Sequence, residues 1–137
     1  MERISRGYKE IEHTADWALM VWAPDLDGLL VEAARGMTAL MEIRFDSSPL
    51  EYRQIELHAE DAESLLVAFL SELLFFGESE GIGFSQGQLT IQNFQLNAEL
   101  VFRRIKSQRK EIKAVTYHNL AIHEIENGLK TVIVFDV

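Results

Sequence analysis

Polar side chains that could bind a metal ion stand at both ends of the chain, each beside an apolar run. The quartet HTAD (residues 13–16) separates two apolar stretches, and Asp136 directly follows the run LKTVIVF. A hard cation such as Ca²⁺ or Mg²⁺ takes oxygen ligands, and one carboxylate rarely suffices. If the chain ends at Val137, its α-carboxylate adds another anionic group. Three carboxylates would converge if the last strand paired beside the strand after Asp16, and a cation would then offset their repulsion.

Simpler structural roles are open for the same residues. Thr14 or Asp16 can close a turn through a side-chain to backbone hydrogen bond. His13 can be a partly buried ring satisfied by one hydrogen bond, and Asp136 can protect a sheet edge against aggregation. The spacing does not choose between these roles and a metal site, because it fixes no strand register.

A second group of candidates lies in the stretch EIKAVTYHNLAIHE, residues 111–124. Strand alternation would place Lys113 on one face, and Thr116 and His118 together on the other. Thr116 and His118 can hydrogen-bond a substrate or a partner, or they can form an ordinary cross-strand pair.

Positive charge concentrates in the segment RRIKSQRK, residues 103–110, with five basic residues and no acidic one. The common reading of such a run is a solvated hairpin loop. It can also meet an acidic protein surface or an RNA phosphate. The segment contains no aromatic residue, so its own sequence does not suggest base stacking.

The overall charge argues against general nucleic-acid binding. Against 22 acidic residues there are 13 basic ones, a net charge of −9, and such a field repels phosphate. We therefore expect no direct DNA binding, and RNA contact only through a local basic patch or a partner. The chain has no cysteine, no apolar run near the ~20 residues of a membrane helix, and no secretory signal pattern at Met1. A cytoplasmic protein without membrane association is the expectation.

The elements that would position these residues follow from hydrophobic periodicity. Period-two or continuous apolar patterns predict strands, and helical spacing predicts two helices, with Asp25 and Asp61 as N-caps. Gly36 lies inside the first helix and suggests a close packing contact there. Asn127-Gly128 predicts a tight hairpin. The predicted strands cover 8–12, 16–23, 51–59, 88–104, 111–125 and 129–136; the first helix covers about 25–43, and the second runs from Asp61 until the glycine-rich stretch 77–87 breaks it.

These elements predict one α+β domain over residues 1–137. Its two helices would pack on a mixed or antiparallel β-sheet. The length suffices for a core without disulfides or structural metal.

Four segments in order along the chain resemble the archease family. They are EHTAD near the start, AEDAESLLVAFLSELLFF in the second predicted helix, EIKAVTYH late in the chain, and VIVFDV at the end. The family pattern differs at Trp17-Ala18, where many members carry Val-Gly or Ile-Gly. It differs also at residues 103–110, where many have a longer loop containing proline and histidine.

The resemblance implies a protein cofactor rather than an enzyme. Archeases assist the RtcB-type RNA ligase, which joins tRNA halves after intron removal, by promoting guanylylation of the ligase and its multiple turnover. Contact with transfer-RNA halves would be indirect, through the ligase. The family also implies a divalent cation, typically Ca²⁺, with Mg²⁺ or Mn²⁺ as alternatives, on Asp16, Asp136 and Val137. Lys113, with His13, Thr116 and His118, is a further candidate for contact with the ligase or its nucleotide.

Two other functions are compatible with the residues. The chain can be a binding module or chaperone for another RNA-processing or RNA-modifying protein, with its acidic surface imitating nucleic acid. It can also be a metal-dependent hydrolase acting alone, although only His13 stands near the carboxylates as a general base.

Overall fold

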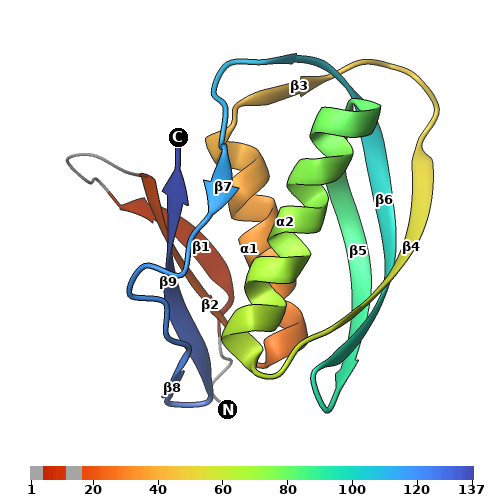
Figure 1. Cartoon of the computed structure of the whole chain (residues 1–137). Helices are drawn as coiled ribbons and strands as arrows, with labels where there is room; N and C mark the ends of the chain where they lie inside the picture. The colour runs from red at the N-terminus through yellow and green to blue at the C-terminus, as the bar shows by residue number, and fades with distance from the viewer. Residues whose placement is uncertain (1–4, 12–16) are drawn as a thin grey trace.

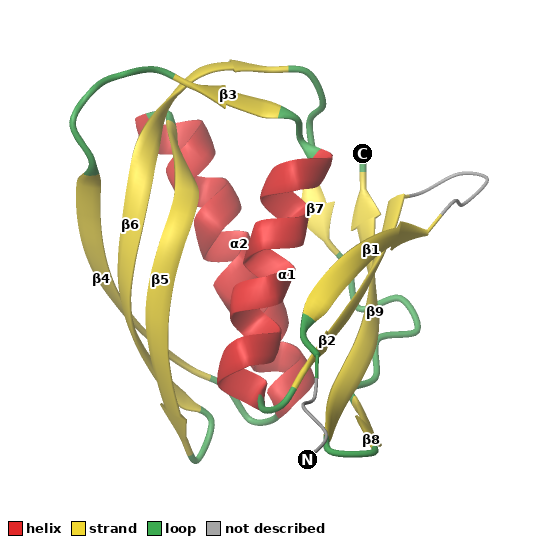
Figure 2. Cartoon of the chain, turned by 180° about the vertical axis from the view of Figure 1, so that it is seen from behind, coloured by secondary structure: helices red, strands yellow, loops and turns green. Residues whose placement is uncertain are grey.

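The computed structural model describes residues 5–11 and 17–137, and places two helices between two antiparallel sheets (Figures 1 and 2). Three layers result, with one continuous hydrophobic core that includes Leu19, Phe69, Phe102 and Phe135, all fully buried. The elements are β1 (Gly7–Ile11), β2 (Trp17–Ala23), α1 (Leu26–Leu40), β3 (Ile43–Phe45), β4 (Glu51–His58), α2 (Ala62–Glu80), β5 (Ile82–Gln92), β6 (Gln95–Gln108), β7 (Ala114–Val115), β8 (His123–Ile125) and β9 (Gly128–Asp136).

The first sheet brings the two ends of the chain together. Its order is β1-β2-β9-β7, with β8 also paired to β9. Strands β2 and β9 pair antiparallel from Trp17 opposite Phe135 to Ala23 opposite Leu129. This is the pairing on which the predicted convergence of terminal carboxylates depends, and it is confirmed.

The second sheet is built around β6, the longest strand described. Its order is β3-β6-β4, and β5 pairs with β6 as well. Every strand pair in the described part of the chain is antiparallel. The α+β class is therefore confirmed, while the single sheet is replaced by two and the mixed alternative is excluded for those strands.

Both helices begin where the sequence predicts. The Asp25 carboxylate accepts a hydrogen bond from the Gly28 N–H at 2.8 Å, and the Asp61 carboxylate accepts one from the Ser64 N–H at 2.7 Å. Each bond satisfies a backbone donor that the first helical turn leaves free. Helix α2 ends at Gly81, whose φ of +69° suits a residue without Cβ.

Gly36 marks the closest approach of α1 to the first sheet. A Cβ at this position would lie 2.6 Å from Leu19 Cδ2 and 2.8 Å from Tyr8 Cγ. The predicted packing contact is confirmed: glycine lets β1 and β2 lie directly against the helix.

Two predicted boundaries in the middle of the chain are wrong. Helix α2 continues through Gly77 and ends at Gly81, because a helix with many apolar contacts tolerates one glycine. The predicted strand 88–104 is a hairpin of β5 and β6. Its two turn residues, Asn93 and Phe94, have φ of +50° and +58°, as a type I′ turn requires.

The late predictions also need correction. Residues 103–108 continue β6, so the basic segment is largely strand and not a hairpin loop. Only β7 and β8 are strands within 111–125. Between them the Leu120 N–H donates to the Tyr117 carbonyl in a turn, and the Ile122 N–H donates to the Glu63 carboxylate of α2. The hairpin near Asn127 is confirmed, with Glu126 and Asn127 in the turn, since Ile125 pairs with Gly128. Strand β3 was not predicted.

In the described residues, neither helix has the length and apolar character needed to cross a membrane.

Candidate functional site

The C-terminal end of β9 lies between two other strands. Phe135 is opposite Trp17 of β2 on one side and opposite Val115 of β7 on the other. The Lys113 N–H donates a 2.8 Å hydrogen bond to the Asp136 carbonyl. The backbone of Asp136 is thereby fixed, while the residue itself is exposed at the end of a buried strand.

The donor set at this end suits a hard cation. Asp136 offers carboxylate oxygens, the ligand type that Ca²⁺ and Mg²⁺ prefer. No basic group of the described residues lies within 4.0 Å of its carboxylate, so the oxygens are not committed to an ion pair there. Val137 follows it and is also exposed, at 37%. No cluster of three or more His, Cys, Asp or Glu with metal-binding geometry occurs within 5–11 and 17–137.

Two of the predicted site residues, His13 and Asp16, lie outside the described residues. Asp16 directly precedes Trp17 in the chain, and Trp17 is the residue paired with Phe135. The register therefore pairs Trp17, which follows Asp16 in the chain, with Phe135, which precedes Asp136.

Thr116 and His118 occupy a turn that follows β7. The Thr116 hydroxyl donates to the Val134 carbonyl at 2.9 Å and accepts from the His118 N–H at 3.2 Å. His118 Nε2 lies 3.3 Å from Asn119 Nδ2, and His118 is exposed. Thr116 is thus engaged in holding the turn to β9, whereas Lys113 and His118 present their side chains to solvent.

Lys110 links the basic segment to the start of β2, a contact that sequence reasoning missed. Its Nζ lies 5.0 Å from the centre of the Trp17 ring and 3.3 Å from Glu42 Oε2. An ammonium over an aromatic face is attracted by the ring quadrupole. The available signal was the unusual Trp17 in the HTAD-W sequence, together with the concentration of positive charge at residues 103–110.

The basic segment also complements the C-terminal ends of both helices, which lie at the same end of the molecule in Figure 1. Neither helix has a basic residue in its own last turn. The Lys110 N–H donates to the Met41 carbonyl at 3.1 Å, and Arg104 Nη1 donates to the Glu80 carbonyl at 3.4 Å. The first of these is a backbone bond, whereas the Arg104 guanidinium adds a cation at the end of α2, which is favourable because the helix dipole is negative there.

A cleft of about 420 Å³ opens between these helix ends and residues 105–112. Its floor is apolar, with Met37, Met41 and Leu73 among the lining, and Glu78 and Lys110 belong to its rim. The cleft adjoins the Trp17 contact through Lys110.

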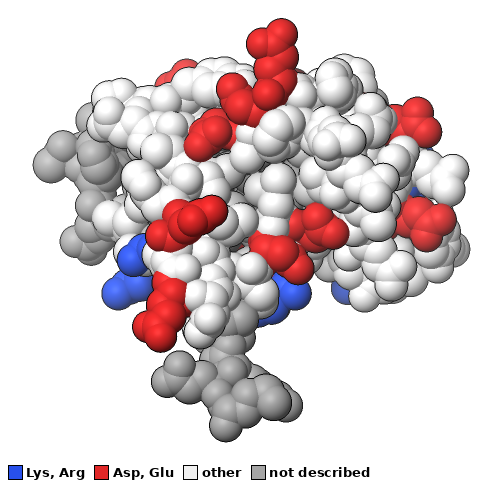
Figure 3. Space-filling model, turned by 90° about the horizontal axis from the view of Figure 1, so that it is seen from below, with Lys and Arg blue, Asp and Glu red and all other residues white. Residues whose placement is uncertain are grey.

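The opposite end of the molecule is acidic. Figure 3, viewed from below, shows Asp and Glu side chains prevailing over Lys and Arg on that face. Both helices begin there, with Asp25 and Asp27 at the start of α1 and Asp61 and Glu63 at the start of α2. These four acidic residues therefore lie at the end of the molecule away from the end of β9 (Figure 1).

Comparison with known proteins agrees with this architecture. The model of the archease protein family matches residues 8–137. The chain belongs to the archease family. An archease of Saccharolobus islandicus is 32% identical over 138 residues, which cover 96% of this chain and 99% of that relative. An archease of Thermococcus kodakarensis is 30% identical over 131 residues, covering 90% and 92%.

Two solved structures of similar proteins share the fold. The solution structure of a Methanobacterium thermoautotrophicum protein has a TM-score of 0.74 at 27% identity, covering 96% of this chain and 99% of that one. The crystal structure of a Thermotoga maritima archease, described as a possible chaperone, has a TM-score of 0.71 at 27% identity and full coverage of both chains. Both support the α+β archease fold.

Proposed function

We propose that this archease-family chain is a metal-binding accessory protein that activates an RtcB-type RNA ligase in tRNA splicing and RNA repair. Its role is to promote guanylylation of the ligase and its multiple turnover, while the chemistry takes place on the ligase. The observation that carries the proposal is the β2–β9 register, which sets Trp17 opposite Phe135. Asp16 and Asp136, the next residues outward, are the proposed metal ligands together with Val137.

The metal would supply positive charge at the tip of the first sheet. There it can bind the phosphate oxygens of a nucleotide, and its charge reduces repulsion among the carboxylates that hold it. Lys113 begins the segment that pairs with Asp136 and offers a compact cation to the same anionic group. We assign His13 and His118 as lower-ranking contacts with the ligase or its nucleotide, and Thr116 as the residue that orients His118.

The test is a guanylylation assay with purified ligase, GTP and this protein. We expect Asp16→Ala and Asp136→Ala to abolish stimulation with the fold retained, and a chelator to reproduce their effect on the wild type. Asp46→Asn, which removes the charge of a half-buried acid at another place and still offers an acceptor to the Ser48 N–H, is the control. Wild-type stimulation by Asp16→Ala would exclude this role for the residue.

A second function is favoured by the description of the Thermotoga maritima relative as a possible chaperone. In that case the partner is another RNA-processing or RNA-modifying protein. Affinity capture that recovers a methyltransferase or nuclease, combined with no effect on ligase guanylylation, would support it.

A further inference from the structure

The outer face of the second sheet carries a trough that the proposed ligase contact does not use. Two adjoining hollows, of about 790 and 550 Å³, share Gln54, Gln88 and Glu99. They lie on the side of β4, β6 and β5 whose residues alternate with the buried core residues. We call this feature the outer trough, and its outward side chains include one aromatic ring, four amides and two carboxylates.

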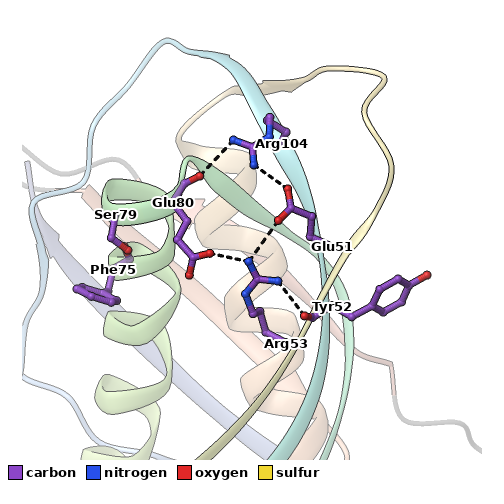
Figure 4. A network of polar contacts seen from close by, with 7 residues as sticks. All are labelled: Glu51, Tyr52, Arg53, Phe75, Ser79, Glu80 and Arg104. Carbon is purple, nitrogen blue, oxygen red and sulfur yellow. Dashed lines mark hydrogen bonds and ion pairs between the residues drawn. The ribbon is translucent and has the colours of Figure 1, made fainter.

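Tyr52 presents an aromatic ring at one end of the trough. It is the most exposed large hydrophobic side chain among the described residues, at 67%. Figure 4 shows that its ring points away from the polar network on the inner side of β4. In that network Arg53 contacts Glu51 and Glu80, and Arg104 contacts Glu51, so β4 is tied to α2 and β6. The strand that carries Tyr52 is consequently held in place from behind.

Amides make up much of the remaining lining. Gln54, Gln86, Gln88 and Asn97 each offer both donors and acceptors, the groups that base edges need. Glu56 and Glu99 are carboxylates instead. The Glu99 Oε1 accepts a 3.3 Å hydrogen bond from Gln54 Nε2, so part of its capacity is used within the trough.

Positive charge stands at the end of the trough next to Tyr52. Tyr52 is opposite Val101, and Arg103 is two residues farther along β6, on the same face at about 6.6 Å. The Arg103 guanidinium lies over the Phe45 ring at 5.3 Å, which directs it toward β3.

Two more cations, Arg44 and Lys106, lie on β3 and farther along β6. The β3–β6 register passes from Arg44 opposite Ser107 to Phe45 opposite Ile105, so Lys106 is the extra residue of a β-bulge. Bulges re-aim side chains, and both Arg44 and Lys106 are exposed. Within 4.0 Å these three cations have no carboxylate partner among the described residues. Nearby, the pKa of the Asp46 carboxyl is lowered by the Ser48 N–H and, to a smaller extent, by Arg104 and Arg103.

From this arrangement we infer that the outer trough is a binding surface for single-stranded RNA. The phosphates would contact Arg44, Arg103 and Lys106, one base would stack on Tyr52, and the amides would bond the base edges. Surfaces for single strands combine a basic track with aromatic rings on a sheet.

The inference deepens the proposed function, because it would let the chain hold an RNA end while the tip of the first sheet meets the ligase. The net charge of −9 would repel RNA phosphates, but local positive charge can offset this repulsion. Arg44, Arg103 and Lys106 have no ion pair among the described residues and lie on β3 and the adjoining part of β6, at the end of the molecule opposite the acidic helix N-termini (Figure 1), where phosphate contact is least opposed by the net charge.

The experiment is fluorescence anisotropy of a labelled single-stranded RNA of about 12 nucleotides, within the site sizes known for such surfaces. The full chain is titrated without ligase and in chelator. The triple variant Arg44→Gln/Arg103→Gln/Lys106→Gln should bind at least about tenfold more weakly at low salt. Its log Kd against log salt slope should be shallower by about 2, the value for three lost contacts on a single strand.

Tyr52 tests the stacking step separately. Tyr52→Ala should weaken binding roughly tenfold with little change in the salt slope, while Tyr52→Phe, which keeps the ring, should bind within about twofold of the wild type. Lys9→Gln/Lys130→Gln removes two cations of the first sheet and should leave affinity close to the wild type. Circular dichroism and thermal unfolding confirm that each variant is folded.

Absence of RNA binding by the folded wild type at low salt would overturn the inference. So would equal affinity of the triple variant, or equal weakening by Tyr52→Ala and Tyr52→Phe. If the triple variant instead lost ligase binding in the absence of RNA, the patch would be a protein interface. Because the assay contains neither ligase nor free metal, its failure leaves ligase stimulation untested, and loss of stimulation in Asp16→Ala does not bear on it.

Discussion

Asp136 shows how the fold can fix the backbone of a residue while its side chain makes no stabilising contact with the rest of the described chain. Buried Phe135 anchors the end of β9, and the Lys113 N–H holds the Asp136 carbonyl, yet the carboxylate of Asp136 has no ion-pair partner among the described residues. A carboxylate carried by a fixed backbone at an exposed strand end is better placed to bind a ligand than to take part in core packing.

Gly36 gives the sharpest test of side-chain packing. Gly36→Ala should destabilise the protein by about 1–2 kcal/mol, because overpacking against Leu19 and Tyr8 costs about 1–3 kcal/mol and exceeds the helix-propensity gain of up to ~1 kcal/mol. Gly77→Ala is the matched control. Its new Cβ would come no nearer than 3.8 Å to another heavy atom, the Ile82 carbonyl oxygen, so stability should rise. Urea unfolding of both variants measures the difference, and a stabilised Gly36→Ala would show that α1 can move away from the sheet.

At the scale of elements, the sequence is most informative where one side chain decides the local geometry. Asp25 and Asp61 are predicted and observed as N-caps, because their carboxylates lie where free backbone N–H groups need acceptors. The β5–β6 hairpin is missed, because Phe94 occupies a turn position with φ of +58° where glycine is the usual signal. The turn propensity of Asn93-Phe94 does not reveal that the hydrogen-bonded pairing of β5 with β6 stabilises this conformation.

The candidate site shows the same division. The sequence places a predicted strand beside each terminal carboxylate, but it fixes neither the pairing nor the register of these strands, which the β2–β9 ladder supplies. The Lys110 contact with Trp17 and Glu42 is not predictable, because it joins residues from three segments that only the complete fold brings together.

The cap of α2 leads to a pH prediction. The pKa of Asp61 is lowered, chiefly by the hydrogen bond from the Ser64 N–H, so the folded state prefers the charged carboxylate. Its contribution to stability is full above the unfolded value of 3.8 and is lost as the pH falls through the lower folded pKa. In Asp61→Asn the cap persists without titrating. The stability of the wild type relative to Asp61→Asn, from urea midpoints, should therefore decline in acid; a pH-independent difference would contradict the assignment.

Asp27, at the start of α1, leads to a pH dependence of stability opposite to that of Asp61. Partial burial, reinforced by Asp25, raises the pKa of Asp27, so charging this carboxyl costs stability in the folded state. That cost is absent at low pH and appears as the pH rises toward and through the raised folded pKa. Asp27→Asn should accordingly be more stable than the wild type at neutral pH, and the gain should vanish in acid. A loss of stability at neutral pH would mean that the helix dipole outweighs burial at this position.

On the scale of the whole molecule, the pairing of β2 with β9 joins the early and late parts of the chain in one sheet. Strand β9 is central in the first sheet and pairs with β2, β7 and β8, while positive charge from residues 103–110 complements the helix ends beside it. The acidic helix N-termini lie at the other end (Figure 3). A protein of net charge −9 can therefore carry a local concentration of cations, of which Arg104, Arg109 and Lys110 are paired with Glu51 or Glu42.

A metal held by both chain ends should stabilise the entire fold, and this follows from the proposed function. A ligand that binds only the folded state at 100 times its Kd adds about 2.7 kcal/mol, which raises the melting temperature of a domain of this size by roughly 5–15 °C. Thermal unfolding in Ca²⁺ or Mn²⁺ should show this rise for the wild type, reversible by chelator. Asp136→Asn and Asp16→Asn should each remove most of it, because each takes away a ligand from one end. Asp46→Asn controls for nonspecific screening of the net charge. If Asp46→Asn and Asp136→Asn respond to Ca²⁺ as the wild type does, the cation acts by screening alone and the two ends do not share a site.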